Sequence, residues 1–158
     1  MNTAYVALGA NLGDPAATLR AAFGALANLP ESRVIRCSSL YRTAPVGNTK
    51  QPEFVNAVAA LETTLAPEAL LDALLDLETR FGRRRAEKNG PRTLDLDLLL
   101  YNNQELDLPR LSLPHPRLHL RAFVLYPLAE IAPELQLPRR GSITAWLPAV
   151  ANQGIAKL

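Results

Sequence analysis

Apolar and polar positions along the chain follow two different spacings. Mainly apolar runs of six to eleven residues, with β-branched and aromatic members, are typical of strands and predict four of them, at 3–8, 34–42, 54–64 and 93–101. Between the first two runs, and again between the last two, apolar residues recur every three or four positions. That period is typical of a helix with one buried face.

Turn and capping residues mark where these helices begin and end. Asp14 and Pro15 suit the N-cap and first turn of a helix with apolar positions at 19, 22, 23 and 26. Pro67 opens a second helix whose Leu70, Leu74 and Leu77 share a face, and Gly82 is placed to end it. A proline-rich region follows the last strand, and a short final helix is predicted near 143–150.

The predicted order is strand, helix, strand, strand, helix, strand. This order indicates an α+β sandwich of the ferredoxin-like type, with a mainly antiparallel sheet and helices packed on it. The fold hosts many functions, so the chemistry has to be inferred from individual sites.

Composition narrows the class of protein. The 158 residues are 48% hydrophobic and 20% charged, which predicts one domain, 1–158, with an ordinary core. A net charge of +2 gives no reason to expect a nucleic-acid partner. The chain begins without a basic flank or a long apolar run, and Cys37 is its only cysteine, so we expect a cytoplasmic protein, not bound to a membrane, with Cys37 buried.

Asp95 and Asp97 are the first candidates for chemistry. Alternate residues of a strand share a face, which puts the two carboxylates together, with Leu94, Leu96, Leu98 and Leu100 on the opposite face. Two adjacent carboxylates repel each other unless a cation or several hydrogen-bond donors offset the charge. Their oxygens suit Mg²⁺. The pair could equally be an exposed strand edge, or be neutralised by Arg92.

A basic segment precedes this strand. It contains Arg83, Arg84, Arg85, Lys88 and Arg92, with Glu87 as its only acid. Such a segment is usually a solvated surface. Next to a candidate metal strand, however, guanidinium groups could bind phosphate oxygens in pairs.

A third cluster combines polar and aromatic residues. His115 lies between two prolines, which favours a fixed hydrogen-bond donor, whereas His119 is expected at the surface of a short helical turn. Taken alone, Phe54 and Phe123 are predicted to be core residues. Asn56 shares the strand face of Phe54 and could recognise a planar heterocycle stacked on that ring. The chain has no phosphate-binding GxxxxGK[ST] loop and no HExxH or CxxC zinc motif.

Several separated segments together resemble the 6-hydroxymethyl-7,8-dihydropterin pyrophosphokinase family. The resemblance is carried by 9–13, 41–43, 51–56, Glu78 with 82–85, 88–99, 113–115 and 121–123. It implies a ferredoxin-like fold and transfer of pyrophosphate from ATP to the pterin alcohol, a step of folate biosynthesis, which yields AMP and the pterin diphosphate. ATP and the pterin would be its partners, and we expect a monomer.

The resemblance also implies roles for individual residues. Asp95 and Asp97 would hold two Mg²⁺ ions, while Arg83 and Arg92 would clamp the phosphates during transfer. Nucleotide contacts would come from Glu78, Arg85, Leu98, Arg110, Ser112, His115 and Arg121. Phe54 and Phe123 would enclose the pterin ring, and its hydrogen-bonding edge would be read by Asn56, Thr43 and the backbone of Ala44 and Val46.

The chain departs from the family pattern at two positions and in the stretch between Gly82 and Gly90, which is one residue shorter than in some relatives. Two other functions also stay open. Asn89 stands where some relatives have Trp, and Leu75 replaces a frequent Gln, so ATP affinity is expected to differ more than the reaction. An RNA-binding module of the RRM type is one alternative, although the RNP1 pattern is absent. A ligand-sensing domain without catalysis is the other.

Overall fold

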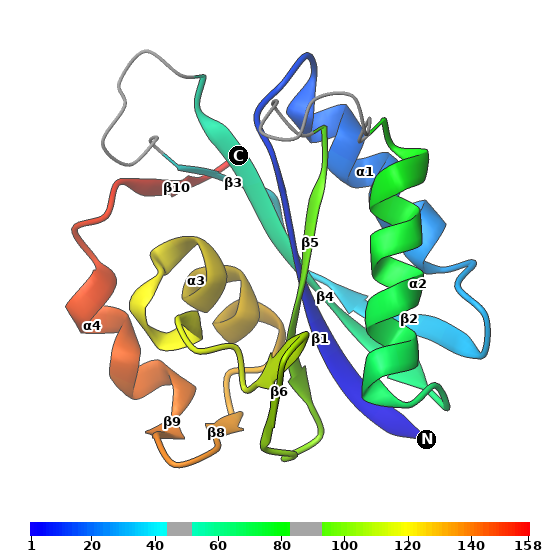
Figure 1. The fold of residues 1–158 in the computed structure, drawn as a ribbon. Helices are drawn as coiled ribbons and strands as arrows, with labels where there is room; N and C mark the ends of the chain where they lie inside the picture. Colours follow the sequence, from blue (N-terminus) through cyan, green and yellow to red (C-terminus); the bar gives the residue numbers. More distant parts are fainter. Residues whose placement is uncertain (44–51, 83–92) are drawn as a thin grey trace.

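The structure is a computed structural model that describes residues 1–43, 52–82 and 93–158. Its first five strands and two longest helices occupy the first two thirds of the chain. The predicted order of elements is confirmed (Figure 1). The elements are β1 (Asn2–Ala10), α1 (Pro15–Leu26), β2 (Ser32–Cys37), β3 (Tyr41–Thr43), β4 (Phe54–Thr63), α2 (Pro67–Arg80) and β5 (Asp95–Tyr101).

The strands form a 6-stranded sheet in the order β10-β3-β4-β1-β5, and β2 also pairs with β4. The edge strand β10 comes from the chain end (Ile155–Lys157). All pairings in this sheet are antiparallel. With the helices between the strands, this is the predicted ferredoxin-like arrangement.

The predicted strand 34–42 is interrupted. β2 pairs with one part of β4 and β3 with another, so the two short strands together occupy one position in the sheet. At the interruption, Ser38 still binds β4, because its N–H donates to the Val58 carbonyl and its Oγ accepts from the Val58 N–H, each at 2.9 Å.

Helices α1 and α2 cover one face of the sheet (Figure 1). Asp14 caps α1, because its Oδ1 accepts a hydrogen bond from the Ala17 N–H at 3.2 Å. The predicted apolar stripe of α2 packs against the sheet through Leu70, Leu74 and Leu77, which are all buried. This face therefore follows directly from the helical period of the sequence.

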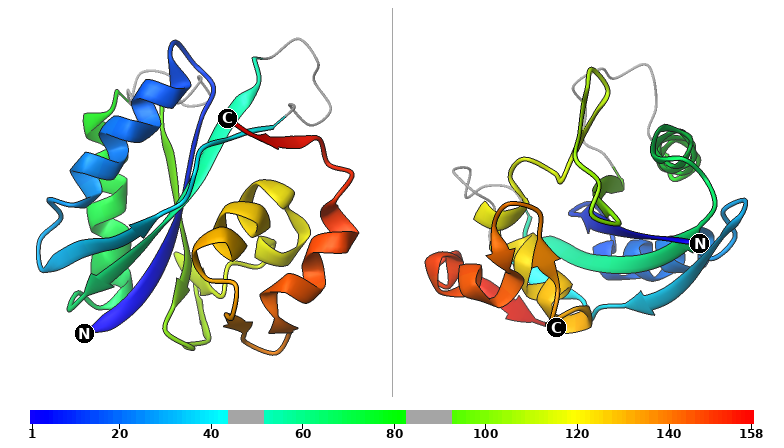
Figure 2. Two further views of the ribbon diagram at one scale, coloured as in Figure 1. Left: turned by 180° about the vertical axis from the view of Figure 1, so that it is seen from behind. Right: turned by 90° about the horizontal axis from the view of Figure 1, so that it is seen from below.

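A helix that the sequence analysis did not predict, α3 (Ala122–Ile131), covers the opposite face of the sheet (Figures 1 and 2). Seven of its ten residues are buried, and it contains Pro127. A helix buried on most sides has no polar face to reveal its period, and an internal proline argues against a helix. For these reasons the sequence pattern predicted no helix in this proline-rich region.

Shorter elements complete the structure. They are β6 (Leu106–Leu108), β7 (Leu111–Leu113), the 3-10 turn η1 (Leu118–Leu120), β8 (Gln136–Leu137), β9 (Gly141–Ser142), the 3-10 turn η2 (Ile143–Trp146) and α4 (Leu147–Val150). Of the helices that lie in the described ranges, none has the length and apolar character needed to span a membrane.

Two expectations about burial were wrong. Cys37 is exposed, because it ends β2, whose residues from Ile35 onward all lie at the surface. His119 does lie in a short helical turn, but its exposed fraction is only 7%, and its ring meets the Trp146 ring edge-on at 5.0 Å between centroids. Trp146 lies far along the chain in η2, so the sequence did not show that it covers His119.

Candidate functional site

Strand β5 carries the two predicted metal ligands. Asp95 and Asp97 pair with Gly9 and Ala7 of β1. Leu96 and Leu98 are buried in the core beneath α1 and α2. The carboxylates therefore point to the opposite face of the sheet, where Asp97 is exposed and Asp95 is half-buried.

A bulge in β5 changes the facing of the residues that follow. Tyr5 pairs with Leu100 and Val6 with Leu98, so Leu99 is the extra residue on this strand. As a result, Leu100 lies in the core on the α3 face, and its predicted place beside Leu98 was wrong. The bulge begins after Leu98, so it leaves the alternation of Asp95 and Asp97 intact.

Glu78 fixes the segment between the two aspartates. This glutamate of α2 is only 3% exposed, and its Oε2 accepts a hydrogen bond from the Leu96 N–H at 2.7 Å. A buried carboxylate accepting a backbone hydrogen bond is a strong tie between two elements. Glu78 thus joins α2 to the free edge of β5.

A cavity of about 430 Å³ opens beside this edge. Five of the predicted nucleotide residues and Asp97 are among those lining it. Its walls are formed by α2, β5 and the β6–β7 hairpin, through Leu71, Leu75, Glu78, Leu96, Asp97, Leu98, Leu108, Pro109, Arg110, Leu111, Ser112, His115 and Pro116. The sequence analysis missed the apolar members Leu71, Leu108 and Leu111, since each alone reads as core.

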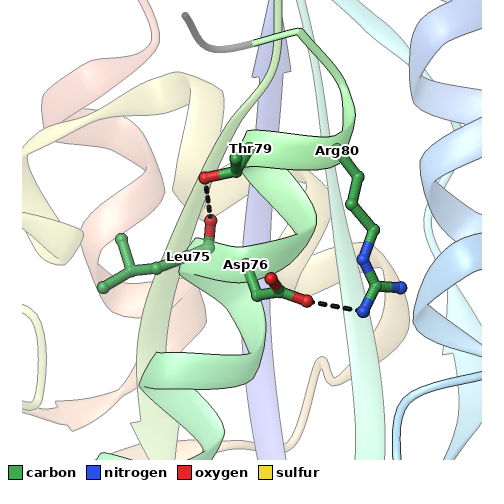
Figure 3. Close-up of polar contacts among 4 residues, drawn as sticks. All are labelled: Leu75, Asp76, Thr79 and Arg80. Atoms are coloured by element: carbon green, nitrogen blue, oxygen red, sulfur yellow. Dashed lines mark hydrogen bonds and ion pairs between the residues drawn. The ribbon is translucent and has the colours of Figure 1, made fainter. Parts of the chain in front are cut away.

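Leu75 is 38% exposed and contributes to this apolar lining. Figure 3 shows its side chain on one side of α2, away from the ion pair in which Arg80 contacts Asp76 at 2.5 Å. The Leu75 carbonyl accepts a hydrogen bond from Thr79 Oγ1 at 3.2 Å. Leu75 therefore presents an apolar surface to the cavity, whereas a Gln there would present hydrogen-bonding groups.

His115 is held by its own backbone and its neighbours. Its N–H donates to the Leu99 carbonyl at 2.9 Å, and its Nδ1 accepts from the Arg117 N–H at 3.2 Å. Burial lowers the pKa of His115, the Asp97 carboxylate partly offsets this, and Arg121 and Arg117 lower the pKa further. A neutral ring whose Nδ1 accepts carries its proton on Nε2. His115 can therefore act as a positioned neutral donor.

A second group of predicted residues lies on the sheet face that α3 covers. Asn56 and Thr43 are 6% exposed each, and Asn56 Nδ2 donates to Thr43 Oγ1 at 2.8 Å. Gly9 packs closely on this pair, because a Cβ at that position would lie 2.9 Å from Asn56 Oδ1. The sequence analysis missed this role of Gly9, which it included only in the segment 9–13 that carries the family resemblance.

The two predicted aromatic residues are half-buried. Phe54 pairs with Thr43 in the sheet, and Phe123 lies in the first turn of α3. The Arg121 guanidinium lies 5.4 Å from the centroid of the Phe123 ring. Both rings thus retain exposed surface, which the simple interpretation as core residues did not predict.

The remaining predicted residues differ in what the structure says of them. Arg110 forms an ion pair with Asp72 of α2 at the cavity. Ala44, Val46, Arg83, Arg85 and Arg92 lie outside the described residues, as does Asn89. Within 1–43, 52–82 and 93–158, no group of three or more His, Cys, Asp or Glu side chains is arranged to hold a metal ion.

Comparison with known proteins decides the family. The model of the 7,8-dihydro-6-hydroxymethylpterin-pyrophosphokinase (HPPK) family matches residues 5–133. The chain belongs to the HPPK family. This result confirms the resemblance found in the sequence.

Two similar HPPK proteins match this chain over almost its full length. A 2-amino-4-hydroxy-6-hydroxymethyldihydropteridine pyrophosphokinase of Pseudomonas aeruginosa is 52% identical over 154 residues, which are 98% of this chain and 95% of the relative. The enzyme of the same name from Haemophilus influenzae is 45% identical over 158 residues, covering 100% of this chain and 99% of the relative.

Solved structures support the fold. A Plasmodium falciparum HPPK-DHPS chain with pteroate superposes with a TM-score of 0.76 at 14% identity, covering 94% of this chain and 42% of that chain. Another HPPK-DHPS structure, in complex with substrates, gives 0.73 at 13% identity, with 94% and 45% covered. The chain thus spans less than half the length of these HPPK-DHPS chains.

Proposed function

We propose that this chain transfers a pyrophosphoryl group from ATP to the hydroxymethyl oxygen of 6-hydroxymethyl-7,8-dihydropterin, releasing AMP and the pterin diphosphate. One observation carries the proposal. Asp97 lines the cavity beside α2, and its neighbour on the same strand face, Asp95, pairs with Gly9, which packs on Asn56. The two carboxylates thus lie between the cavity and the hydrogen-bonded Asn56 and Thr43 side chains on the sheet.

The aspartates fit Mg²⁺, of which we expect two ions. Both offer hard oxygen ligands from one strand face, and the exposed side of Asp97 leaves room for phosphate oxygens to complete the coordination. Bound Mg²⁺ would supply positive charge to those phosphate oxygens. Asp95 and Asp97 would place it, because the Glu78 hydrogen bond holds the strand between them.

Residues around the cavity would bind ATP. β5 lies at the edge of the sheet, and the Leu96 N–H points away from β1 and donates to Glu78. Every second residue of a strand has its N–H and C=O on the same side, so the backbone of Leu98 also points away from β1, toward the cavity. We expect it to pair with the edge of adenine, while Leu71 and Leu75, which line the same cavity, would cover the face of the ring. Ser112, His115 and Arg110 line the same cavity and would bind ribose or phosphate oxygens, as would Arg121.

The sheet face that carries Asn56 and Thr43 would bind the pterin. Asn56 and Thr43 would recognise its amide edge, together with the backbone of Ala44 and Val46. Asn56 already donates to Thr43, which fixes its orientation and leaves its Oδ1 as an acceptor. Phe54 and Phe123 would stack on the two faces of the ring.

Transfer would need positioning more than covalent catalysis. The hydroxymethyl oxygen would attack the β-phosphorus in line and lose its proton to water. The bond between that phosphorus and the oxygen bridging to the α-phosphorus would break, and its electron pair would leave with AMP. Arg83 and Arg92 would stabilise the charge that develops on the phosphates, with Arg85 as a further contact. Neutral His115 would donate its Nε2 proton in a hydrogen bond to a phosphate oxygen.

We further propose that residues 1–158 form a single domain and that the protein acts in the cytoplasm as a monomer, without nucleic-acid or membrane partners. Its test is to mix the purified chain with Mg²⁺, ATP and the pterin alcohol and to measure AMP. AMP that depends on both substrates supports the proposal. Binding of both ligands without AMP would indicate a ligand sensor, and binding of RNA alone would indicate an RRM-like module.

A further inference from the structure

Residues 153–158 at the end of the chain contact two separate elements that carry proposed pterin-site residues. β10 pairs with β3, and Ile155 is the partner of Thr43. Figures 1 and 2 show β10 beside β3 at the edge of the sheet, with the chain approaching it from α4. The family model ends at residue 133, so this segment lies beyond the matched part of the chain.

Gln153 ties this segment to the start of α3. Its Oε1 accepts a hydrogen bond from the Ala122 N–H at 2.9 Å, and its Nε2 donates to the Leu120 carbonyl at 3.0 Å. Leu120 and Ala122 flank Arg121, so the side chain of Gln153 binds the main chain on both sides of that arginine.

The first turn of α3 receives its cap from this glutamine. The first N–H groups of a helix have no partner within the helix, and Arg121, the N-cap residue, makes no side-chain capping hydrogen bond. Gln153 supplies an acceptor from a distant part of the chain instead. Phe123 belongs to the turn that this bond fixes.

We propose that Gln153 is a positioning residue for the pterin site, acting through Phe123. The inference rests on the proposed function, because it takes Phe123 as a wall of the pterin pocket. An aromatic side chain has only two torsions with which to compensate for a movement of its backbone, so a small shift of the first turn misplaces the Phe123 ring. The longer Arg121 side chain can absorb the same shift. Gln153 should therefore affect pterin binding more than nucleotide binding.

Three variants test this role: Gln153→Ala, Gln153→Glu and Asn152→Ala. Calorimetry would measure the affinity for a nonhydrolysable ATP analogue with Mg²⁺, and then for the pterin in its presence. If the pterin site feels the full cost of losing the cap, pterin affinity should weaken about five-fold in Gln153→Ala, with analogue affinity changed less than about two-fold. Gln153→Glu keeps the acceptor for the Ala122 N–H but loses the donor to the Leu120 carbonyl, so its pterin affinity should fall between those of the parent and Gln153→Ala. Asn152→Ala, at an exposed neighbouring residue, should match the parent.

A double-mutant cycle with Phe123→Ala separates positioning from general stabilisation. If Gln153 acts through the ring, Gln153→Ala should have no further effect on pterin affinity when Phe123 is already Ala. Parent-like pterin affinity in Gln153→Ala, or an undiminished effect in the Phe123→Ala background, would overturn the inference while leaving the proposed function intact. A parent protein that neither binds the pterin nor forms AMP would overturn both.

Discussion

The carboxylate of Glu78 accepts a hydrogen bond from the N–H of Leu96 at 2.7 Å, and Leu96 lies between Asp95 and Asp97. Glu78 comes from α2 and Leu96 from the free edge of β5. An edge strand lacks a neighbour to satisfy its outward N–H groups, so a buried side chain from the covering helix takes that place here. The strand segment that carries the proposed metal ligands is thereby fixed to α2, and its Asp97 side chain lines the cavity.

Replacement of Glu78 tests this tie. Glu78→Ala would leave the buried Leu96 N–H without its acceptor, and we expect the free energy of unfolding to fall by about 1–3 kcal/mol. Glu78→Gln keeps an acceptor oxygen and should lose less. Urea denaturation measures both variants, and equal losses would show that the charge of Glu78, and not its hydrogen bond, supports the fold.

Removal of a proposed metal ligand should abolish turnover without unfolding the protein. Asp97→Ala deletes an exposed carboxylate from a strand whose buried leucines are unchanged, so circular dichroism should match the parent. We expect AMP formation to fall by well over ten-fold, and Asp95→Ala to behave similarly. A folded variant within about ten-fold of parent activity, or ~1.4 kcal/mol of barrier, would contradict the role of the pair in holding metal.

The pKa of His115 should respond to Asp97. Burial holds the pKa of His115 below its ordinary value of 6.5, and the Asp97 carboxylate acts in the opposite direction. Asp97→Asn removes that carboxylate, so an NMR titration should show a still lower pKa for His115.

His119 provides the control, because its pKa is also lowered, first by burial and then by Arg140. Arg140→Ala should raise the pKa of His119 and leave that of His115 unchanged. Because the pKa values of His115 and His119 are lowered in the folded state, the unfolded chain binds more protons than the folded chain as the pH falls below about 6.5. The stability from the two neutral rings is therefore present above that pH and lost below it. A His115 pKa that does not move in Asp97→Asn would refute the coupling.

Two glycines give a matched pair of substitutions. Gly9→Ala places a Cβ 2.9 Å from Asn56 Oδ1, so Asn56 must move, and we expect weaker pterin binding with unchanged ATP binding. Gly24→Ala puts a Cβ into open space within α1 and should raise stability by about 0.5–1 kcal/mol. Calorimetry and thermal unfolding measure the two effects. If Gly9→Ala bound pterin like the parent, the close packing of Gly9 on Asn56 would have no part in recognition.

The sequence by itself determined the order of the elements from β1 to β5, the faces of α1 and α2, and the membership of the family. These features depend on residues close together in the chain, such as an amphipathic period, the capping residue Asp14 or a continuous motif. They can therefore be recognised from the sequence alone. The alternation of Asp95 and Asp97 on one strand face is local in the same sense.

Only the tertiary structure decided which distant residues meet. The burial of His119 depends on Trp146, the bulge at Leu99 depends on pairing with β1, and the cap of α3 comes from Gln153. Helix α3 itself was missed because a helix enclosed on most sides has no polar face to mark its period. These features arise from contacts between segments far apart along the chain, and such contacts leave no regular spacing in the sequence.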